Sequence, residues 1–180
     1  MKNELDVVRD LVYRFAQGHI AYMLTGSFAM NYYAQPRMTR DIDVVVELRP
    51  QDVDTISNLF DSDYYVAREA VERAITRESV FNLLHHETVI KVACIVRKSS
   101  AYRRLEFERR GRITIQDFTT WIVSKEDLII SKLVWARDAQ PELQLRDVRN
   151  LLATGYDADY LTKWTRELGV DELWQECLHE

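Results

Sequence analysis

Hydrophobic residues recur along the chain at two different spacings, and each spacing predicts one kind of element. Between residues 4 and 17 they recur every three or four positions, as on the buried face of a helix. These side chains are Leu5, Val8, Leu11, Val12 and Phe15. Gly18 then supplies a stop. By the same reasoning, further helices are predicted at residues 28–34, 51–60, 68–77, 100–110, 124–138, 142–154, 157–168 and 171–178.

Shorter runs rich in β-branched and aromatic residues predict strands. The clearest is the segment 41–48, whose interior Val44–Val46 is β-branched throughout. Other strands are predicted at residues 21–24, 64–66, 80–85, 88–96, 112–115 and 119–123.

The order of these elements predicts an α+β fold. Strands and helices are mixed in residues 1–123, whereas residues 124–180 are predicted to be helical only. We therefore expect a mixed sheet flanked by helices, with a helical C-terminal subdomain packed on that core. The chain has 180 residues, of which 47% are apolar, and this suits one domain with a small helical appendage.

Composition excludes several classes of protein. No run of about 18 apolar residues is present, so no membrane span is expected. The N-terminus carries acids and a helical pattern, unlike a secretory signal. Cys94 and Cys177 are too few and too far apart for a disulfide framework or a zinc site. We expect a cytoplasmic protein with two free thiols.

Charge is unevenly distributed although the net charge is only −5. Residues 97–112 contain seven basic side chains against Glu106 and Glu108, whereas residues 157–180 contain seven acids against Lys163 and Arg166. The basic segment suits the phosphates of RNA or of a nucleotide. The alternative for each of these side chains is an ordinary solvated helix surface.

Asp41 and Asp43 are the first candidates for chemistry. They begin an otherwise apolar strand, and side chains at i and i+2 of a strand share one face. Two neighbouring carboxylates repel each other and call for a cation, and oxygen ligands favour Mg²⁺. The alternative is a pair of solvated aspartates at a strand end.

Gly26 and Ser27 form a second candidate site at a predicted turn from strand to helix. Glycine permits a sharp turn and the close approach of a ligand. Ser27 stands where a helix N-cap is expected, and the N–H groups of the first helical turn favour phosphate. An ordinary helix cap is the alternative. Together with the aspartates one strand away, the pair predicts a site for a metal-bound phosphate.

This arrangement resembles the nucleotidyltransferases of the DNA polymerase beta superfamily. The resemblance rests on Gly-Ser at 26–27 after a strand, followed by the Arg-x-Thr-x-Asp-x-Asp form of residues 37–43 and a second strand. This spacing is most similar to the small bacterial group that includes the AbiEii-type toxins. The resemblance extends to about residue 155, because Ser-x-Glu-Asp-Leu-Ile-x-x-Lys at 124–132 and Leu-Arg-Asp-Val at 145–148 also look like that group.

The resemblance implies a role for each matching residue. Two Mg²⁺ ions would be held by Asp41 and Asp43, and the nucleoside triphosphate, such as ATP, by the Gly-Ser turn. The remaining nucleotide contacts it implies are Arg37, Thr39, Lys132 and Asp147. Arg40 is a further cation near the phosphates. Lys132 would touch the triphosphate, and Asp147 would orient Lys132 or a group of the substrate. The alternatives are a surface position for Lys132 and, for Asp147, a structural role as the partner of an arginine or lysine across a helix pair.

The chain departs from the family at one position. The third carboxylate of the family arrives in a Lys-Val-Asp context, and the matching run here is Lys91-Val92-Ala93. Without that carboxylate a metal loses a ligand and the attacking hydroxyl loses a proton acceptor. Three explanations remain: a natural pseudoenzyme, an engineered substitution that inactivates an otherwise intact site, which we favour, or a third acid elsewhere in the sequence, with Glu47 and Glu87 as candidates.

The preferred hypothesis is transfer of a nucleoside monophosphate from a triphosphate to an acceptor hydroxyl, impaired here by Ala93. The acceptor is an RNA such as tRNA, a protein, or a small molecule such as an aminoglycoside. The resemblance suggests the toxin of a bacterial toxin–antitoxin pair, with an antitoxin as partner. The alternatives are a non-catalytic binder of nucleotide or partner on the same fold, and a purely structural domain. The oligomeric state is left open.

Overall fold

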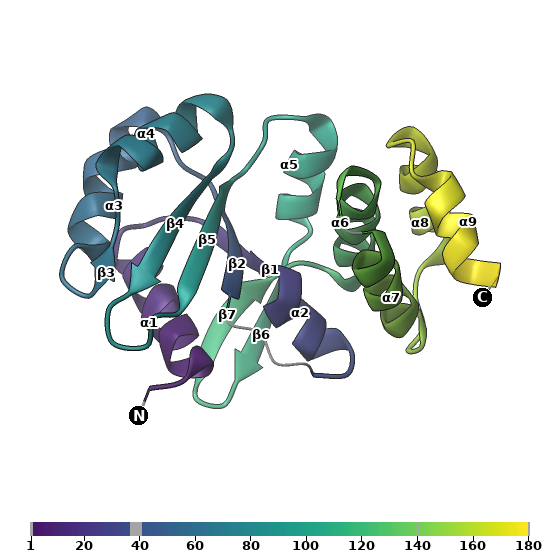
Figure 1. Cartoon of the computed structure of the whole chain (residues 1–180), viewed down its shortest axis with the longest axis horizontal. Coiled ribbons are helices and arrows are strands. Elements are labelled where there is room, and N and C mark those ends of the chain that lie inside the picture. Colours follow the sequence, from purple (N-terminus) through teal and green to yellow (C-terminus); the bar gives the residue numbers. More distant parts are fainter. Residues whose placement is uncertain (1, 37–40, 140, 180) are drawn as a thin grey trace. The chain divides into compact units, whose positions relative to one another are not determined.

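The computed structural model describes residues 2–36, 41–139 and 141–179 (Figure 1). The chain divides into two compact units. One comprises Met1–Phe28 and Met38–Val123, and the other comprises Ala29–Arg37 and Ser124–Glu180. Residues 29–37 thus group with the C-terminal helices. The boundary expected from the sequence, at residue 123, placed these residues in the core instead.

A mixed sheet forms the centre of the first unit (Figure 1). Its seven strands in the described part of the chain are β1 (Tyr22–Thr25), β2 (Asp41–Val46), β3 (Tyr64–Tyr65), β4 (Val80–His85), β5 (Lys91–Val96), β6 (Gly111–Ile115) and β7 (Phe118–Ile122). Their order is β3-β4-β5-β2-β1-β7-β6. The pairs β2·β5 and β1·β7 are parallel and the other pairs are antiparallel.

The helices of the first unit form where the sequence pattern predicts them. They are α1 (Glu4–Gln17), α3 (Val53–Phe60), which follows the short 3-10 turn η1 (Pro50–Asp52), α4 (Arg68–Arg77) and α5 (Ala101–Glu108). α1 begins with a capping box, in which Asn3 and Asp6 satisfy each other's backbone N–H groups, and Gly18 caps its end. α3 packs against α1 and α4, and α4 packs against β4 and β5.

The two faces of the sheet differ in burial at its centre. In β2, Ile42 and Val44 are buried, whereas Asp41 is exposed and Asp43 half-buried. β4 and β5 repeat this alternation, so one face is covered and the other is more exposed. The candidate chemistry therefore lies on the less covered face.

The second unit is helical. It contains α6 (Lys125–Asp138), α7 (Pro141–Leu152), α8 (Ala158–Glu167) and α9 (Asp171–His179), together with the later part of α2 (Gly26–Tyr33). Ser124 caps α6 by accepting the N–H of Asp127, and Asp157 caps α8 in the same way through Tyr160. α6 and α9 contact each other, and each of them also contacts both α7 and α8.

The α+β fold expected from the sequence is confirmed, and most element boundaries agree within about two residues. β5 is the main difference, because it begins at Lys91 instead of residue 88. Residues 86–89 form a turn in which Val89 has a left-handed φ of 57°. In α1, Val7 is buried although the predicted stripe does not include it. Leu5 and Val12, which the predicted stripe includes, are only half-buried.

Both cysteines are buried free thiols. Among the described residues, none of the helices combines the length and apolar character that a membrane crossing needs.

Candidate functional site

The strand register brings the predicted acids and the position of the missing acid together. Asp43 of β2 lies opposite Thr25 of β1 on one side and opposite Ala93 of β5 on the other. Ala93 in turn lies opposite Asn82 of β4. Residues paired across neighbouring strands point to the same face, so all four belong to one row on the less covered face. A carboxylate at position 93 would stand beside Asp43.

Gly26 and Asp43 are in direct contact. A Cβ atom placed on Gly26 would lie 2.1 Å from Oδ2 and 2.8 Å from Cβ of Asp43. Gly26 also has a left-handed φ of 59°, which L side chains rarely adopt. The position therefore requires glycine twice over, for its backbone and for the space that Asp43 fills. The convergence of the turn with an acid of β2, predicted from the sequence, is present.

Ser27 does not cap the helix. α2 begins at Gly26, so Ser27 lies within its first turn, and the N-cap position predicted for it is wrong by one to two residues. The left-handed backbone of Gly26 lets the chain enter the helix directly from β1. The N–H groups of a first turn have no partner within the helix, which keeps this turn suited to phosphate.

Asp41 forms an ion pair with Lys91. The two residues lie opposite each other on the parallel strands β2 and β5, and Nζ of Lys91 is 3.2 Å from Oδ2 of Asp41. The side chains are 51% exposed for Asp41 and 47% exposed for Lys91. From the sequence, Lys91 was considered only as part of the Lys-Val-Ala run. Its i, i+2 spacing from Ala93 places both residues on one face of the strand, and this spacing could have identified Lys91 as a residue of the site.

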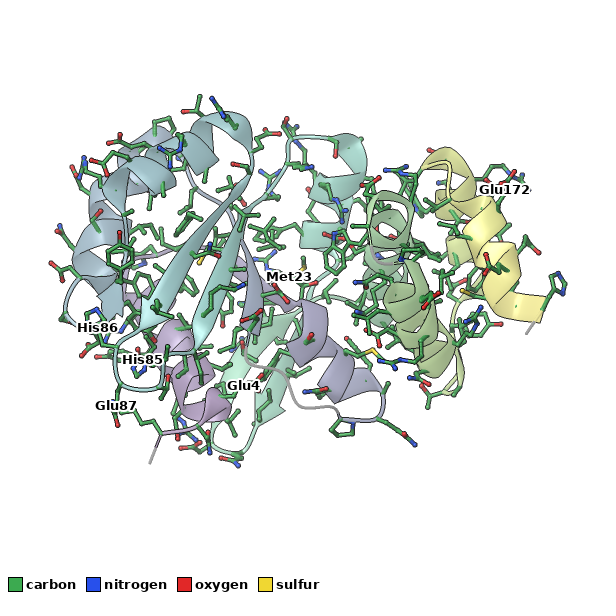
Figure 2. All side chains as sticks on the ribbon, viewed as in Figure 1. Glu4, Met23, His85, His86, Glu87 and Glu172 are labelled. Atoms are coloured by element: carbon green, nitrogen blue, oxygen red, sulfur yellow. The ribbon has the colours of Figure 1, made fainter. Side chains whose placement is uncertain are left out.

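Neither acid considered as a replacement for the third carboxylate stands beside Asp43. Glu47 follows the far end of β2, roughly 13 Å along the strand from Asp43, and pairs with Arg97 at 3.5 Å. Glu87 lies in the turn after β4, next to His85 and His86 in Figure 2, and pairs with Lys2 at 2.8 Å. Both candidates are therefore wrong.

Asp41 and Asp43 are the acids on this face that could hold a divalent ion. Two carboxylates together with the phosphates of a nucleotide can complete the octahedral shell of one Mg²⁺. Among the residues that the structure describes, no group of three or more histidine, cysteine, aspartate or glutamate side chains is arranged to hold a metal ion. The strand register places no further carboxylate beside Asp43, since Ala93 stands at that position.

Lys132 and Asp147 form a buried ion pair within the second unit. Nζ of Lys132 on α6 lies 2.8 Å from Oδ2 of Asp147 on α7 and 3.4 Å from Oε1 of Gln144. The side chains are only 2% and 1% exposed, so a surface position for Lys132 is wrong. The pairing of Asp147 with Lys132 was expected. A contact of Lys132 with a triphosphate stays a prediction.

The remaining predicted nucleotide contacts, Arg37 and Thr39, lie outside the described residues, as does Arg40.

Several side chains of the basic segment contact aromatic rings. The guanidinium of Arg110 lies 4.2 Å from the ring centre of Phe107 and 4.7 Å from that of Trp121. Arg112 lies 5.5 Å from the same tryptophan. Burial lowers the pKa of Arg110 from its ordinary value. The segment is thus partly packed against the sheet and is not simply a solvated charged helix.

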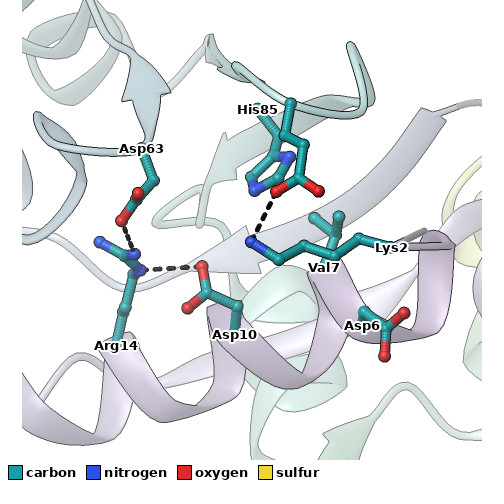
Figure 3. A pocket seen from close by; sticks show the side chains of 8 residues that line it. Lys2, Asp6, Val7, Asp10, Arg14, Asp63 and His85 are labelled. Atoms are coloured by element: carbon teal, nitrogen blue, oxygen red, sulfur yellow. Dashed lines mark hydrogen bonds and ion pairs between the residues drawn. The ribbon is translucent and has the colours of Figure 1, made fainter.

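A cavity of about 380 Å³ lies between α1 and the ends of β3 and β4 (Figure 3). Its charged groups pair with one another: Arg14 binds both Asp10 and Asp63, and Lys2 binds Glu87. Glu87, considered from the sequence as a replacement for the third carboxylate, is one of its lining residues, whereas Asp41 and Asp43 do not line it. The i, i+4 spacing of Asp10 and Arg14 on α1 predicts only their ion pair.

His85 is the buried titratable group of this cavity. Its Nδ1 atom accepts the backbone N–H of Thr88 at 3.2 Å. Burial is the largest cause that lowers the pKa of His85, and the charge of Lys2 adds to it. The imidazole is therefore held in its neutral form more strongly than a solvated histidine.

Comparison with known proteins finds similarity in structure only. No protein-family model matches the chain, and no curated protein matches its sequence. The lincosamide antibiotic adenylyltransferase LnuA, solved with lincomycin bound, is 19% identical with a TM-score of 0.54, covering 84% of this chain and 96% of its own.

Two further solved structures are similar. An antigenic nucleotidyltransferase-like protein from Paracoccidioides brasiliensis is 17% identical with a TM-score of 0.58, covering 84% of this chain and 76% of its own. The antibiotic-resistance factor ANT(2'')-Ia is 12% identical with a TM-score of 0.64, covering 98% of this chain and 96% of its own. At these identities the likeness establishes the fold, and the fold of this chain is that of the nucleotidyltransferases.

Proposed function

We propose that the chain binds a nucleoside triphosphate with Mg²⁺ at Gly26, Asp43 and Ala93, and that this site is built for transfer of a nucleoside monophosphate to an acceptor hydroxyl. The observation that carries the proposal is the contact of Gly26 with Asp43, because it joins a phosphate-binding turn to a metal-binding carboxylate. Transfer is impaired because Ala93 supplies no carboxylate.

Each residue has a separate task in this proposal. The first turn of α2, with Ser27, takes the phosphates through its N–H groups, and Asp41 and Asp43 hold the divalent ion against them. The ion, when bound, neutralises charge on the phosphates and on the leaving pyrophosphate. Lys132, oriented by Asp147, is proposed as a further phosphate contact, as are Arg37 and Thr39.

Ala93 decides how much chemistry the site can do. The acceptor hydroxyl must lose a proton as it attacks the α-phosphate, and a carboxylate beside Asp43 would take that proton. A methyl group cannot accept a proton or bind a metal. We therefore expect binding of nucleotide with little or no transfer, and the carboxylate is the missing part.

The acceptor is proposed from the resemblance and from the basic segment 97–112. An RNA such as tRNA or a protein suits that segment, and the biological role would be the toxin of a toxin–antitoxin pair in the bacterial cytoplasm, with an antitoxin as partner. The similar structures include enzymes named for antibiotics, so an antibiotic hydroxyl is the alternative acceptor.

A second candidate function is supported by Ala93 itself. A chain that keeps the turn and two acids, but lacks the third, suits a protein that binds nucleotide without turning it over. Such a protein would act through its nucleotide-bound state on a partner.

The deciding experiment restores the acid. The Ala93→Asp variant, the unchanged chain and an Ile95→Asp control are incubated with labelled triphosphates, Mg²⁺, and total RNA, cell protein or aminoglycosides. Ile95 lies on the same face of β5, roughly 7 Å further along, so its variant adds the same charge away from Asp43.

We expect pyrophosphate release and a labelled acceptor only with Ala93→Asp. The labelled fraction then identifies the acceptor. Nucleotide binding by all three chains without any transfer would favour the second candidate function, and no nucleotide binding by any of them would contradict both.

A further inference from the structure

Lys91 changes the charge of the proposed site. Its ammonium lies 3.2 Å from Oδ2 of Asp41, and Lys91 stands two positions before Ala93 on the same face of β5. With Asp41 and Asp43 negative and Lys91 positive, the three side chains carry a net charge of about −1. A third carboxylate at position 93 would make it about −2.

That difference bears on the number of metal ions that the site can hold. A bound triphosphate carries about four negative charges, and a single divalent ion neutralises only about half of them, so phosphate charge is left for a further cation such as Lys91. Ala93 also removes the oxygen that a second ion would need between β2 and β5. The ligands present therefore suit one ion, and the remaining phosphate charge suits an ammonium group.

Lys91 is placed to act where the second ion is missing. A lysine side chain is a flexible stem of four carbons that ends in a compact charge and binds phosphate as a point charge. The methyl group of Ala93 leaves the face of β5 beside Asp43 open to that stem. Because the ion pair with Asp41 is about half exposed at both ends, the ammonium can exchange one anion for another at little cost.

We propose that the site binds a nucleoside triphosphate with a single divalent ion, and that the ammonium of Lys91 contacts the phosphates in place of a second ion. This inference rests on the proposed function and specifies how the same site recognises its nucleotide. Lys91 is thus a nucleotide-binding residue that compensates for Ala93. The pairing with Asp41 is its position when nucleotide is not bound.

Two measurements on the intact chain test this. ATP affinity is measured by calorimetry with Mg²⁺ for the unchanged chain and for Lys91→Gln, Lys91→Arg and Lys98→Gln. Bound Mn²⁺ per chain is counted by electron paramagnetic resonance at saturating ATP, for the unchanged chain and for Ala93→Asp. Lys98 is an exposed lysine beyond the other end of β5, so its variant loses the same charge away from the site.

We expect Lys91→Gln to weaken ATP binding about tenfold or more, since hydrogen bonds to charged groups are the strong ones. Lys91→Arg keeps the charge and should lose less affinity than Lys91→Gln, and Lys98→Gln should leave ATP binding nearly unchanged. We expect one Mn²⁺ per chain for the unchanged protein and two for Ala93→Asp.

Two results overturn the inference alone. One is an ATP affinity of Lys91→Gln equal to that of the unchanged chain, and the other is a count of two Mn²⁺ ions bound per unchanged chain. Failure of the unchanged chain to bind ATP at all would overturn the proposed function together with it. Circular dichroism of each variant separates a lost contact from a lost fold.

Discussion

At the scale of single residues, the site depends on the groups that two of its residues lack. Gly26 has no Cβ atom, and the carboxylate of Asp43 occupies the space that one would fill. Ala93 has no carboxylate, and the sheet register puts its methyl group next to the same aspartate. The first absence lets the turn and the acid meet, and the second limits what they can do.

We expect Gly26→Ala to destabilise the fold by about 1–3 kcal/mol, because alanine is strained at a left-handed φ and its Cβ would displace Asp43. Urea unfolding measures this. The matched control is Gly169→Ala, where φ is 69° and no atom lies within 4 Å of the added Cβ. If the two variants lose the same free energy of unfolding, the backbone strain alone accounts for the loss and the contact with Asp43 contributes nothing.

At the scale of elements, buried charges decide how neighbouring segments pack. The ion pair of Lys132 with Asp147 joins α6 to α7, and an ion pair so deeply buried makes each partner depend on the other. His85 plays a different part at the end of β4, where a buried neutral imidazole accepts the N–H that closes the turn before β5.

Asp147→Leu alone should leave the ammonium of Lys132 buried without its carboxylate, and we expect a loss of about 3–5 kcal/mol in the free energy of unfolding. The double variant Lys132→Met/Asp147→Leu removes both charges and should regain most of that loss. Guanidinium unfolding of the single and double variants compares the two. A double variant no more stable than the single one would contradict a charge-based origin.

His85 makes stability depend on pH. Since burial lowers its pKa below the ordinary value of 6.5, the unfolded chain binds a proton more readily than the folded one. Its stabilising effect is complete above the unfolded pKa and is lost as the pH falls through the lower folded pKa. Between about pH 7 and pH 5, we expect the free energy of unfolding of the unchanged chain to fall more steeply than that of His85→Asn, which keeps an acceptor for the N–H of Thr88. Parallel curves would exclude this role.

At the scale of the whole molecule, nucleotide binding should couple to folding, because the unfolded chain has no site. At a ligand concentration of about 100 times Kd the stabilisation is about 2.7 kcal/mol, which corresponds to a rise in Tm of about 5–10 °C for a chain of this length. Scanning calorimetry with MgATP measures it. Asp43→Asn should abolish most of the rise, and a rise unchanged in that variant would place the nucleotide elsewhere.

The two units of the chain carry different parts of the predicted chemistry. The turn, the aspartates and Ala93 lie in the first unit, while Lys132 and Asp147 lie in the second. The geometry within each unit therefore supports a separate claim: a metal and phosphate site in one, and a buried ion pair in the other.

The sequence by itself determined what depends on neighbouring positions along the chain. The helical spacing of residues 4–17 predicts α1, and the i, i+2 spacing of Asp41 and Asp43 predicts that they share a face of β2. These features follow from the periods of helix and strand, which are local. The glycine before Ser27 could be assigned to a turn for the same reason, although the first residue of the helix could not.

Only the tertiary structure decided which strands became neighbours. The parallel pairing of β2 with β5 brings Lys91 to Asp41 and Ala93 to Asp43, and nothing in the local pattern specifies that register. Burial of Lys132 likewise requires the packing of α6 against α7, since a lysine on an isolated helix is a surface residue. Pairing and burial arise from contacts between distant segments, whose free energy no single segment contains.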